Sequence, residues 1–427
     1  MTSLNASKEQ LTGSQNLGVE GLLEQLEAFG QSHLCHHYKA LKESNPDLAA
    51  RFLKQLSHLD LPLNQRLFQE LAISGEKQEK RAIQPLEPDT LDAIAYEQAR
   101  AVGLKAIEDG QLAVLLLAGG QGSRLGHEGP KGTFDIGLES SKSLFEIQAD
   151  ALKQVAKQAN FAPMWYVMTS ATNHLETVAF FEAHHYFDYP QSRIRFFEQG
   201  MMPSVDFENR ILLAEPGQLA LNPDGNGGCF IAMKRHGIID ALKSEGVKWL
   251  FLYGVDNAIV NVADPAFLGY AIQCGKPAAS KVVAKAHPHE KVGVLCYDRA
   301  RPAIVEYSEM TEEDNLALDQ SGQLLYRNGN ILNHLLSLEV LAAYMDQPLT
   351  FHLATKKIPF WSSTEGYCQP GQPNGYKYES FIFDLFPHFE DMGALMVARD
   401  MEFAPVKNAT GEDSPETARA LYLKKHA

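Results

Sequence analysis

The chain has 427 residues, of which 45% are hydrophobic and 21% charged, and its formal net charge is -15. This length is typical of two or three domains, and the negative charge argues against nucleic acid and anionic membrane as main partners. A small phosphorylated substrate stays possible, because a few lysines and arginines in one pocket can bind it. The apolar runs are too short to cross a bilayer, and five scattered cysteines without a CxxC pair predict reduced thiols and a cytoplasmic location.

Residues 20 to about 105 are predicted to be helical. Segments such as "DLAARFLKQL" and "LNQRLFQELA" place apolar residues three and four positions apart, with few β-branched residues. The segment "SHLCHHYKA" offers several candidate metal ligands, but no second ligand pair lies nearby, so a helix with surface histidines is the favoured interpretation. We assign residues 1–105 to a helical N-terminal region.

From about residue 110, short β-rich runs alternate with helical segments, which predicts an α/β fold with a mostly parallel sheet. In such sheets ligands bind at the carboxyl ends of the strands. We assign residues 106–405 to this domain and residues 406–427 to a short C-terminal tail, whose last segment predicts a helix with basic residues in its final turn. The strand candidates are "LAVLLLA", "MWYVMTS", "RIRFFEQ", "KWLFLYGVD", "SKVVAKA", "VGVLCYD" and "AIVEYSE".

The loop "LAGGQGSRLG", residues 117–126, follows the first strand candidate and contains four glycines. Glycine-rich loops after strands let a backbone approach a phosphate. Neither common template fits, because the third glycine of the dinucleotide motif would fall on Leu125 and no GK[ST] follows. Arg124 and Lys131 flank the loop, and two cations beside free backbone N–H groups suit a polyphosphate. A tight turn with surface cations is the alternative.

Asp256, in "YGVDN", ends a buried apolar strand candidate, where an unpaired carboxylate is unfavourable. A bound Mg²⁺ would offset that cost, since one or two carboxylates plus substrate phosphates commonly hold this ion. The alternative role, capping the next helix, fits Asp264 better. The glycine-rich segment "NPDGNGG", residues 222–228, is by itself typical of an ordinary polar loop.

Several residues further along complete the set of candidates: Glu306, Asn330, Lys377 and Lys407, with Phe381 and Phe383 two positions apart. The spacing of the two phenylalanines predicts that they share one face of a strand, where packing in the core is the favoured interpretation.

Taken together and in this order, these segments resemble the UDP-N-acetylhexosamine pyrophosphorylases (UDP-N-acetylglucosamine diphosphorylases) of eukaryotic type. The similarity runs from about residue 25 to 420. It is carried by "LAGGQGSRLG", "PKGTFDIGL", "FFEQGMMPS", "PDGNGG", "YGVDNAIVNVADPAFLGY", "KVVAKAHPHEKVGVLC", "VEYSE", "NGNILNH", "KKIP", "PNGYKYESFIFDLF" and "EFAPVKNA".

The resemblance implies a Rossmann-like, GT-A-like nucleotide-diphospho-sugar transferase fold with a mixed, mostly parallel sheet. It implies that UTP and N-acetylglucosamine 1-phosphate give UDP-N-acetylglucosamine and pyrophosphate, with Mg²⁺ as cofactor. Members of the family usually continue into a small C-terminal β domain, which we expect to be absent here because the sequence ends at Ala427.

The resemblance also implies roles for individual residues. Those expected to hold the uridine end are Leu117, Ala118, Gly119, Gly120, Gln199, Gly225 and Asn226. Asp256 would lie at the phosphates of UTP as a ligand of Mg²⁺. Those expected around the sugar phosphate are Gly293, Glu306, Asn330, Phe381, Phe383 and Lys407. The cations expected to face the triphosphate, and to act in catalysis, are Arg124, Lys131 and Lys377.

In the implied reaction a sugar-phosphate oxygen attacks the α-phosphorus of UTP in line. Because the nucleophile is already an anion, the chemistry needs alignment and charge neutralisation rather than a general base. Three alternatives stay open: a UDP-glucose or UDP-galactose type of sugar pyrophosphorylase, a non-catalytic nucleotide-sugar-binding protein, and a glycosyltransferase, which would normally carry a DxD motif. We expect a monomer or a homodimer.

Overall fold

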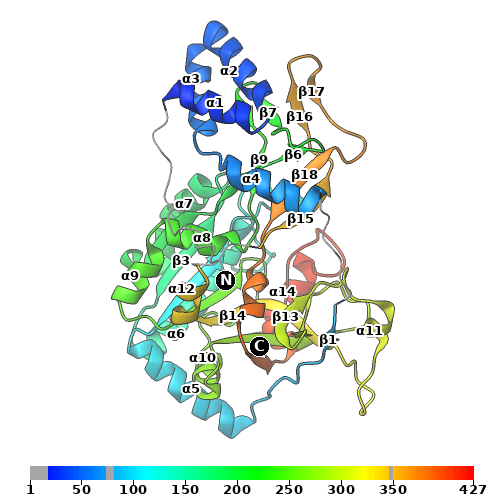
Figure 1. Cartoon of the computed structure of the whole chain (residues 1–427). Coiled ribbons are helices and arrows are strands. Elements are labelled where there is room, and N and C mark those ends of the chain that lie inside the picture. Colours follow the sequence, from blue (N-terminus) through cyan, green and yellow to red (C-terminus); the bar gives the residue numbers. More distant parts are fainter. Residues whose placement is uncertain (1–17, 74–80, 346–349) are drawn as a thin grey trace, which may run out of the picture. The chain divides into compact units, whose positions relative to one another are not determined.

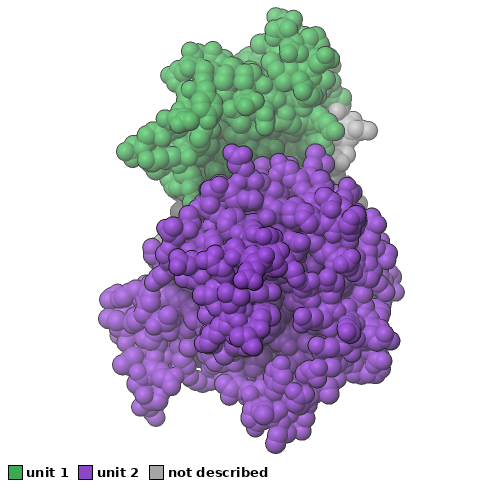
Figure 2. All heavy atoms as spheres, turned by 180° about the vertical axis from the view of Figure 1, so that it is seen from behind, with its two compact units in different colours: residues 1–78, 201–224, 351–379 green, residues 79–200, 225–350, 380–427 purple. Residues whose placement is uncertain are grey.

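In the computed structural model, described for residues 18–73, 81–345 and 350–427, the chain forms two compact units. Of the described residues, unit 1 contains 18–73, 201–224 and 351–379, and unit 2 contains 81–200, 225–345, 350 and 380–427 (Figure 2). This division differs from the continuous regions predicted from the sequence, whose borders lay at residues 105 and 405. Two later segments, residues 201–224 and 351–379, join the N-terminal helices, and α5 (Ala93–Glu108) belongs to unit 2.

Unit 1 combines the N-terminal helices with short strands. The predicted helices are confirmed over residues 20–73, but residues 81–92 of the predicted helical region form β1 (Ile83–Gln84) and non-helical chain. Two helices begin at side-chain caps: the side chains of Asn45 and Asp60 accept hydrogen bonds from the N–H groups of Leu48 and Leu63. The elements are α1 (Val19–Ala28), α2 (Ser32–Ser44), α3 (Pro46–Leu56), α4 (Leu61–Leu67), β5 (Met201–Pro203), β6 (Val205–Asp206), β7 (Leu213–Glu215), β8 (Gln218–Leu219), β9 (Leu221–Pro223), β15 (His352–Lys356), β16 (Phe360–Ser362), β17 (Gly366–Cys368) and β18 (Gly375–Glu379).

Polar side chains of α2 and its N-cap attach the segment 201–224 to the helices. The Gln31 side chain donates to the backbone oxygen of Asn209 at 2.7 Å, and Nε2 of His37 accepts from the N–H of Gly217 at 3.0 Å. His33 and His37 are half-buried, so the expected surface position is wrong for these two histidines, because they bind backbone of the inserted segment. Among the described residues, no group of three or more His, Cys, Asp or Glu side chains is arranged to hold a metal ion.

Unit 2 is built on one large mixed sheet (Figure 1). Its elements are β1 (Ile83–Gln84), α5 (Ala93–Glu108), β2 (Leu112–Leu117), α6 (Leu144–Ala159), β3 (Met164–Thr169), α7 (His174–Ala183), β4 (Ile194–Glu198), α8 (Gly228–Arg235), α9 (Ile238–Ser244), β10 (Trp249–Gly254), α10 (Pro265–Cys274), β11 (Ala278–Ala284), β12 (Val294–Asp298), β13 (Arg301–Val305), α11 (Glu312–Leu316), β14 (Asn328–Ser337), α12 (Leu338–Tyr344), β19 (Gly393–Met396), α13 (Arg399–Glu402) and α14 (Pro415–Lys425).

The predicted α/β fold is confirmed. The main strand order is β1-β12-β14-β10-β2-β3-β4, and β11 and β13 pair with β14 and β12. Strands β10, β2, β3 and β4 run parallel, and β14 runs antiparallel to β10 and β11. All seven strand candidates from the sequence form strands of this sheet.

The central strand β2 is buried along its whole length because helices cover both faces of the sheet. Alternate residues of the strand point to opposite faces. One set packs with α5, α6 and α10, and the other packs with α8, α9 and α12. A continuous apolar run is therefore the expected sequence signature here.

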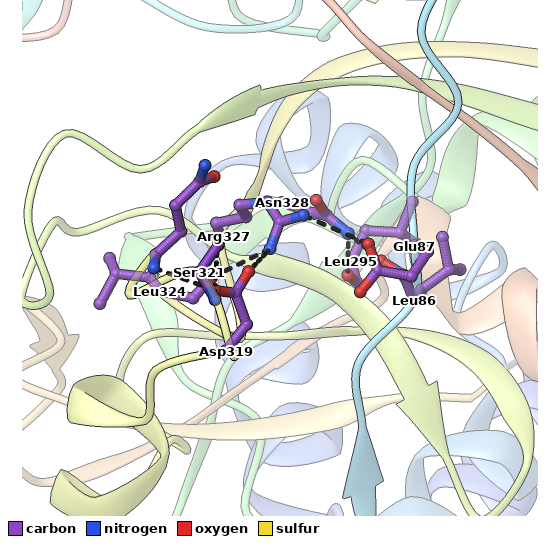
Figure 3. Close-up of polar contacts among 9 residues, drawn as sticks. Leu86, Glu87, Leu295, Asp319, Ser321, Leu324, Arg327 and Asn328 are labelled. Atoms are coloured by element: carbon purple, nitrogen blue, oxygen red, sulfur yellow. Dashed lines mark hydrogen bonds and ion pairs between the residues drawn. The ribbon is translucent and has the colours of Figure 1, made fainter.

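A polar cluster fixes the beginning of β14, the strand that carries Asn330. The Asn328 side chain donates to the backbone oxygens of Leu86 and Leu295 at 2.6 and 3.4 Å (Figure 3). Arg327 beside it forms ion pairs with Asp319 at 3.0 Å and with Glu87 at 3.2 Å. These contacts attach the segment before α5 to the sheet.

The C-terminal segment is part of unit 2. Helix α14 carries Lys424 and Lys425 in its last turn, as predicted. Ala418 of α14 is fully buried and packs in one cluster with Val406, Ile136 and Leu144, so this segment contributes to the core of the unit. Across the residues that the structure describes, no helix combines the length and the apolar content needed to cross a membrane.

Candidate functional site

The glycine loop begins at the carboxyl end of β2, and part of its backbone, at Gly120, is open to solvent. Gly119 lies against the Gln199 side chain, and a Cβ on Gly119 would be 3.0 Å from Oε1 of Gln199. At Gly120 a Cβ would meet no atom within 4 Å. The structure therefore brings Gln199 to the predicted uridine-binding loop, and it leaves space where a ligand can approach the backbone.

The turn after the loop folds Lys131 back onto it. The N–H of Lys131 donates to the backbone oxygen of Gly120 at 3.1 Å, and the N–H of Gly122 donates to Gly129 at 3.0 Å. Nζ of Lys131 lies 4.0 Å from Oδ2 of Asp256, which follows the neighbouring strand β10 by two residues. Parallel strands thus deliver the predicted phosphate-binding cation and the predicted metal ligand to one edge of the sheet.

Three cations gather at this edge, and we call Arg124, Lys131 and Lys407 the cation cluster. Burial lowers the pKa of Lys131, whose side chain is 17% exposed, and the nearby positive charges of Lys407 and Arg124 lower it further. The carboxylates of Asp256 and Asp413 act in the opposite direction. Nζ of Lys407 lies 3.5 Å from Oδ2 of Asp413. A polyanionic ligand would complete the neutralisation of this group.

The turn that contains Asp256 is held by hydrogen bonds to residues 402–406. Its backbone oxygen accepts from the N–H of Val406 at 2.9 Å. The buried side chain of Asn257 donates to the oxygen of Glu402 at 2.7 Å and accepts from the N–H of Ala404 at 3.0 Å. Both contacts join the Asp256 turn to the segment that leads to Lys407. The prediction that Asp264 caps α10 is confirmed, since its side chain accepts from Ala266 at 2.9 Å.

A second group of predicted residues lies on β14 and on the segments that flank β12 and β13. The N–H of Asn330 donates to the oxygen of Gly293 at 2.8 Å. A Cβ on Gly293 would be 2.9 Å from Oε1 of Glu306, so glycine leaves room for that carboxylate. Burial raises the pKa of Glu306, as does the charge of Glu309, while the charge of Lys407 lowers it. Glu306 is thus within electrostatic reach of the cation cluster.

A third group joins the glycine turn before α8 to the segment after β18. Gly225 has a φ of +89°, and a Cβ there would be 2.2 Å from the backbone oxygen of Ser380. Oδ1 of Asn226 accepts from the N–H of Ile382 at 3.0 Å. The glycine turn therefore fixes the backbone beside Phe381, and only glycine fits this approach.

The expectation that Phe381 and Phe383 share a strand face is wrong. Phe381 precedes a short 3-10 helix, Ile382–His388, that contains Phe383. The N–H groups of Phe381 and Ile382 bond to the side chains of Asp384 and Asn226, which takes this backbone out of any strand ladder. The two rings nevertheless stack, with centroids 5.0 Å apart and planes 13° from parallel.

Every predicted site residue except one lies in unit 2. The exception is Lys377 on β18 of unit 1, where its ammonium donates to Oδ1 of Asn222. Burial lowers the pKa of Lys377, and the charge of Lys356 lowers it further.

Two buried asparagines at the carboxyl edge of the sheet in unit 2 were not predicted from the sequence. Asn173 and Asn257 are 0% and 4% exposed, and both bond to backbone of loops that carry predicted site residues. Each one follows a strand within four residues, which is the only sequence signal that would have pointed to them.

Two hollows lie at opposite edges of the sheet in unit 2. One, of about 780 Å³, lies where β2, β3 and β4 begin, with Leu112, Met164 and Arg193 in its lining. The other, of about 460 Å³, lies beside the glycine loop and is lined by Gln121, Ser123, Gly126, His127, Glu128, Gly129 and Glu176. Ligands of parallel α/β sheets bind at the carboxyl ends of strands, so the smaller hollow marks the relevant edge.

Comparisons with known proteins find relatives over most of the chain. The family described as UTP–glucose-1-phosphate uridylyltransferase matches residues 63–422. The UDP-N-acetylglucosamine pyrophosphorylase of Saccharomyces cerevisiae is 38% identical over 417 residues, which cover 92% of this chain and 87% of the relative. The crystal structure of the uridine diphosphate N-acetylglucosamine pyrophosphorylase from Trypanosoma brucei has a TM-score of 0.83 at 29% identity, covering 97% of this chain and 85% of that one. A UDP-glucose phosphorylase from Trypanosoma brucei shares the fold, with a TM-score of 0.62 at 19% identity over 92% of this chain and 78% of that one.

Proposed function

We propose that this chain transfers a uridylyl group from UTP to N-acetylglucosamine 1-phosphate. The chain belongs to the family of UTP–glucose-1-phosphate uridylyltransferases and, within it, to the UDP-N-acetylglucosamine pyrophosphorylases. The products are UDP-N-acetylglucosamine and pyrophosphate. The observation that carries the proposal is the cation cluster, which lies next to an open glycine loop at the carboxyl edge of the sheet.

The residues suit this chemistry. A phosphate oxygen of the sugar phosphate forms a bond to the α-phosphorus of UTP, and the bond between the α-phosphorus and the bridging oxygen of pyrophosphate breaks. Both reactants are anions, so the site must hold them together against their repulsion. Arg124, Lys131 and Lys407 supply positive charge for this and for the charge that develops on the leaving pyrophosphate. No proton has to leave the nucleophile, so the reaction requires no general base.

Asp256 is the proposed ligand of Mg²⁺. It presents a carboxylate that is 27% exposed, at the end of the strand next to the glycine loop. Magnesium is often bound through one or two carboxylates together with substrate phosphates, so a single carboxylate fits this ion. When bound, Mg²⁺ neutralises phosphate charge.

The other roles are proposed from the arrangement of the groups. Gly119, Gly120 and Gln199, with Gly225 and Asn226, would hold the uridine end. Glu306 and Asn330, with Gly293 between them, would bind the sugar, and the stacked phenylalanines would cover it. Lys377 is proposed to face the triphosphate, as the family resemblance implies.

The deciding experiment measures pyrophosphate release and UDP-sugar formation from UTP and Mg²⁺ with a panel of sugar 1-phosphates. We expect N-acetylglucosamine 1-phosphate to be the preferred acceptor. Preference for glucose or galactose 1-phosphate would overturn the choice of sugar. UTP binding without pyrophosphate release for any acceptor would favour a non-catalytic nucleotide-binding protein. Lys131→Ala should lose turnover and keep its fold, whereas Lys157→Ala, which removes an exposed lysine on α6, should retain both.

We also propose a cytoplasmic location and a monomeric or homodimeric state. The five cysteines, all within the described residues, are free thiols and three of them are buried, which supports a reducing compartment. Light scattering on the purified protein would establish the oligomeric state.

A further inference from the structure

A buried asparagine holds the glycine loop from behind. Asn173 lies between β3 and α7 and is 0% exposed. Its Nδ2 donates to the backbone oxygens of Ala118 and Gly120 at 2.8 and 3.3 Å. Its Oδ1 accepts from both the N–H and the Oγ of Ser170, at 2.8 and 3.1 Å. All four hydrogen-bonding positions of the amide are therefore used.

These bonds orient the peptide groups of the loop. In a trans peptide the carbonyl oxygen and the next N–H point in opposite directions. Because Asn173 attracts the oxygens of Ala118 and Gly120, the N–H groups of Gly119 and Gln121 point away from it. Among the described residues, neither N–H group donates to a protein acceptor. Two free donors thus lie in the loop at a position where a Cβ on Gly120 would meet only open space.

The backbone oxygen of Gly120 also links Asn173 to Lys131 of the cation cluster. The oxygen of Gly120 accepts from the N–H of Lys131 at 3.1 Å as well as from Asn173. The asparagine therefore fixes a backbone group that the loop and Lys131 share.

We propose that Asn173 is a positioning residue for nucleotide binding, which sets the N–H groups of Gly119 and Gln121 toward UTP. The inference rests on the proposed function, because it assigns UTP to this loop. Asn173 touches no reacting atom, so its effect passes through the loop backbone.

Two substitutions separate this role from general stabilisation. Asn173→Ala removes all four hydrogen bonds. Asn173→Asp keeps an acceptor for Ser170 but places an oxygen opposite the oxygens of Ala118 and Gly120. The matched control is Asn328→Ala, since Asn328 is 3% exposed and its Nδ2 also donates to two backbone oxygens, at 2.6 and 3.4 Å (Figure 3).

Calorimetry should show that the dissociation constant for UTP rises about tenfold or more in Asn173→Ala, and at least as much in Asn173→Asp. In both variants the carbonyl groups of Ala118 and Gly120 lose the donor that fixes the loop. Asn328→Ala should bind UTP within about twofold of the wild type, although it too loses two buried hydrogen bonds to backbone oxygens. The KM for the sugar 1-phosphate should stay nearly unchanged in the Asn173 variants. Hydrogen exchange of residues 118–122 in the free protein should be faster in these variants and unchanged in Asn328→Ala.

The outcomes distinguish the two proposals. UTP affinity that is equal in Asn173→Ala and in the wild type would overturn the positioning role alone. An equal loss in Asn328→Ala would overturn it too, because the effect would then follow stability. If the wild-type protein binds no UTP, both the proposed function and the role of Asn173 fail. If Asn173→Ala does not fold, Asn173→Asp and its exchange rates at residues 118–122 decide.

Discussion

Gly225 is a predicted site position where a single methyl group should disturb the backbone. Its φ of +89° is unfavourable for alanine, which costs about 1–2 kcal/mol. The added Cβ would also lie 2.2 Å from the oxygen and 2.6 Å from the nitrogen of Ser380, where ordinary contacts are 3.4–4 Å. Relief of such overpacking typically costs about 1–3 kcal/mol. Gly225→Ala should therefore lose roughly 2–5 kcal/mol of stability.

Gly237 provides the control for the backbone contribution. It has a φ of +66°, and a Cβ there would meet no atom within 4 Å. Gly237→Ala should thus lose only the conformational part, about 1–2 kcal/mol. Urea unfolding of both variants, followed by circular dichroism, measures the difference. The reasoning fails if Gly225→Ala is as stable as Gly237→Ala. Since the clash moves the backbone before Phe381, we also expect a higher KM for the sugar 1-phosphate in Gly225→Ala alone.

The remaining predictions concern charged groups. Because the pKa of Lys131 is lowered in the free protein, kcat/KM for UTP should fall at an alkaline pH below the ordinary range of lysine, and Lys131→Arg should move this fall to higher pH in a kcat/KM–pH profile. The pKa of Glu306 is raised in the folded protein, so its contribution to stability is present at acid pH and is lost as the pH rises through the folded-state pKa. Glu306→Gln should accordingly unfold at a higher temperature than the wild type at neutral pH, and melting curves in acid should show the advantage disappear. Lys281 is fully buried between Asp264 and Glu402 at 2.6 and 2.8 Å. Lys281→Met should therefore lose about 3–5 kcal/mol by leaving two buried carboxylates without their cation, and unchanged unfolding midpoints would contradict this.

The sheet of unit 2 could be predicted because burial leaves a direct mark on the sequence. Strands covered on both faces, such as β2, appear as continuous apolar runs, and their order along the chain matches the alternation of strands and helices. The division into two units could not be predicted. It depends on bonds such as those from Gln31 and His37 to residues 209 and 217, which join segments about 180 positions apart and have no local pattern.

The site was predictable where residues carry charge and follow a strand. Lys131 and Asp256 meet because parallel strands end at the same edge of the sheet. Phe381 and Phe383 were assigned to a strand from their spacing, and side chains at Asn226 and Asp384 override that local preference by taking the backbone N–H groups. Asn173 and similar residues act on the backbone carbonyls of another loop, so their partners appear only in the folded chain.

The carboxylates beside the cation cluster explain how the half-buried Lys131 can keep its charge before a polyphosphate binds. Lys131 is desolvated on folding, which by itself favours loss of its proton, and Arg124 and Lys407 add to this effect. Asp256 and Asp413 oppose it, so the free protein keeps its cations close to one another without a bound anion. Phosphates that enter bring further negative charge, which favours the ammonium form more strongly. The cost of desolvating Lys131 is therefore met during folding, and the charge is already in place when the leaving pyrophosphate needs it.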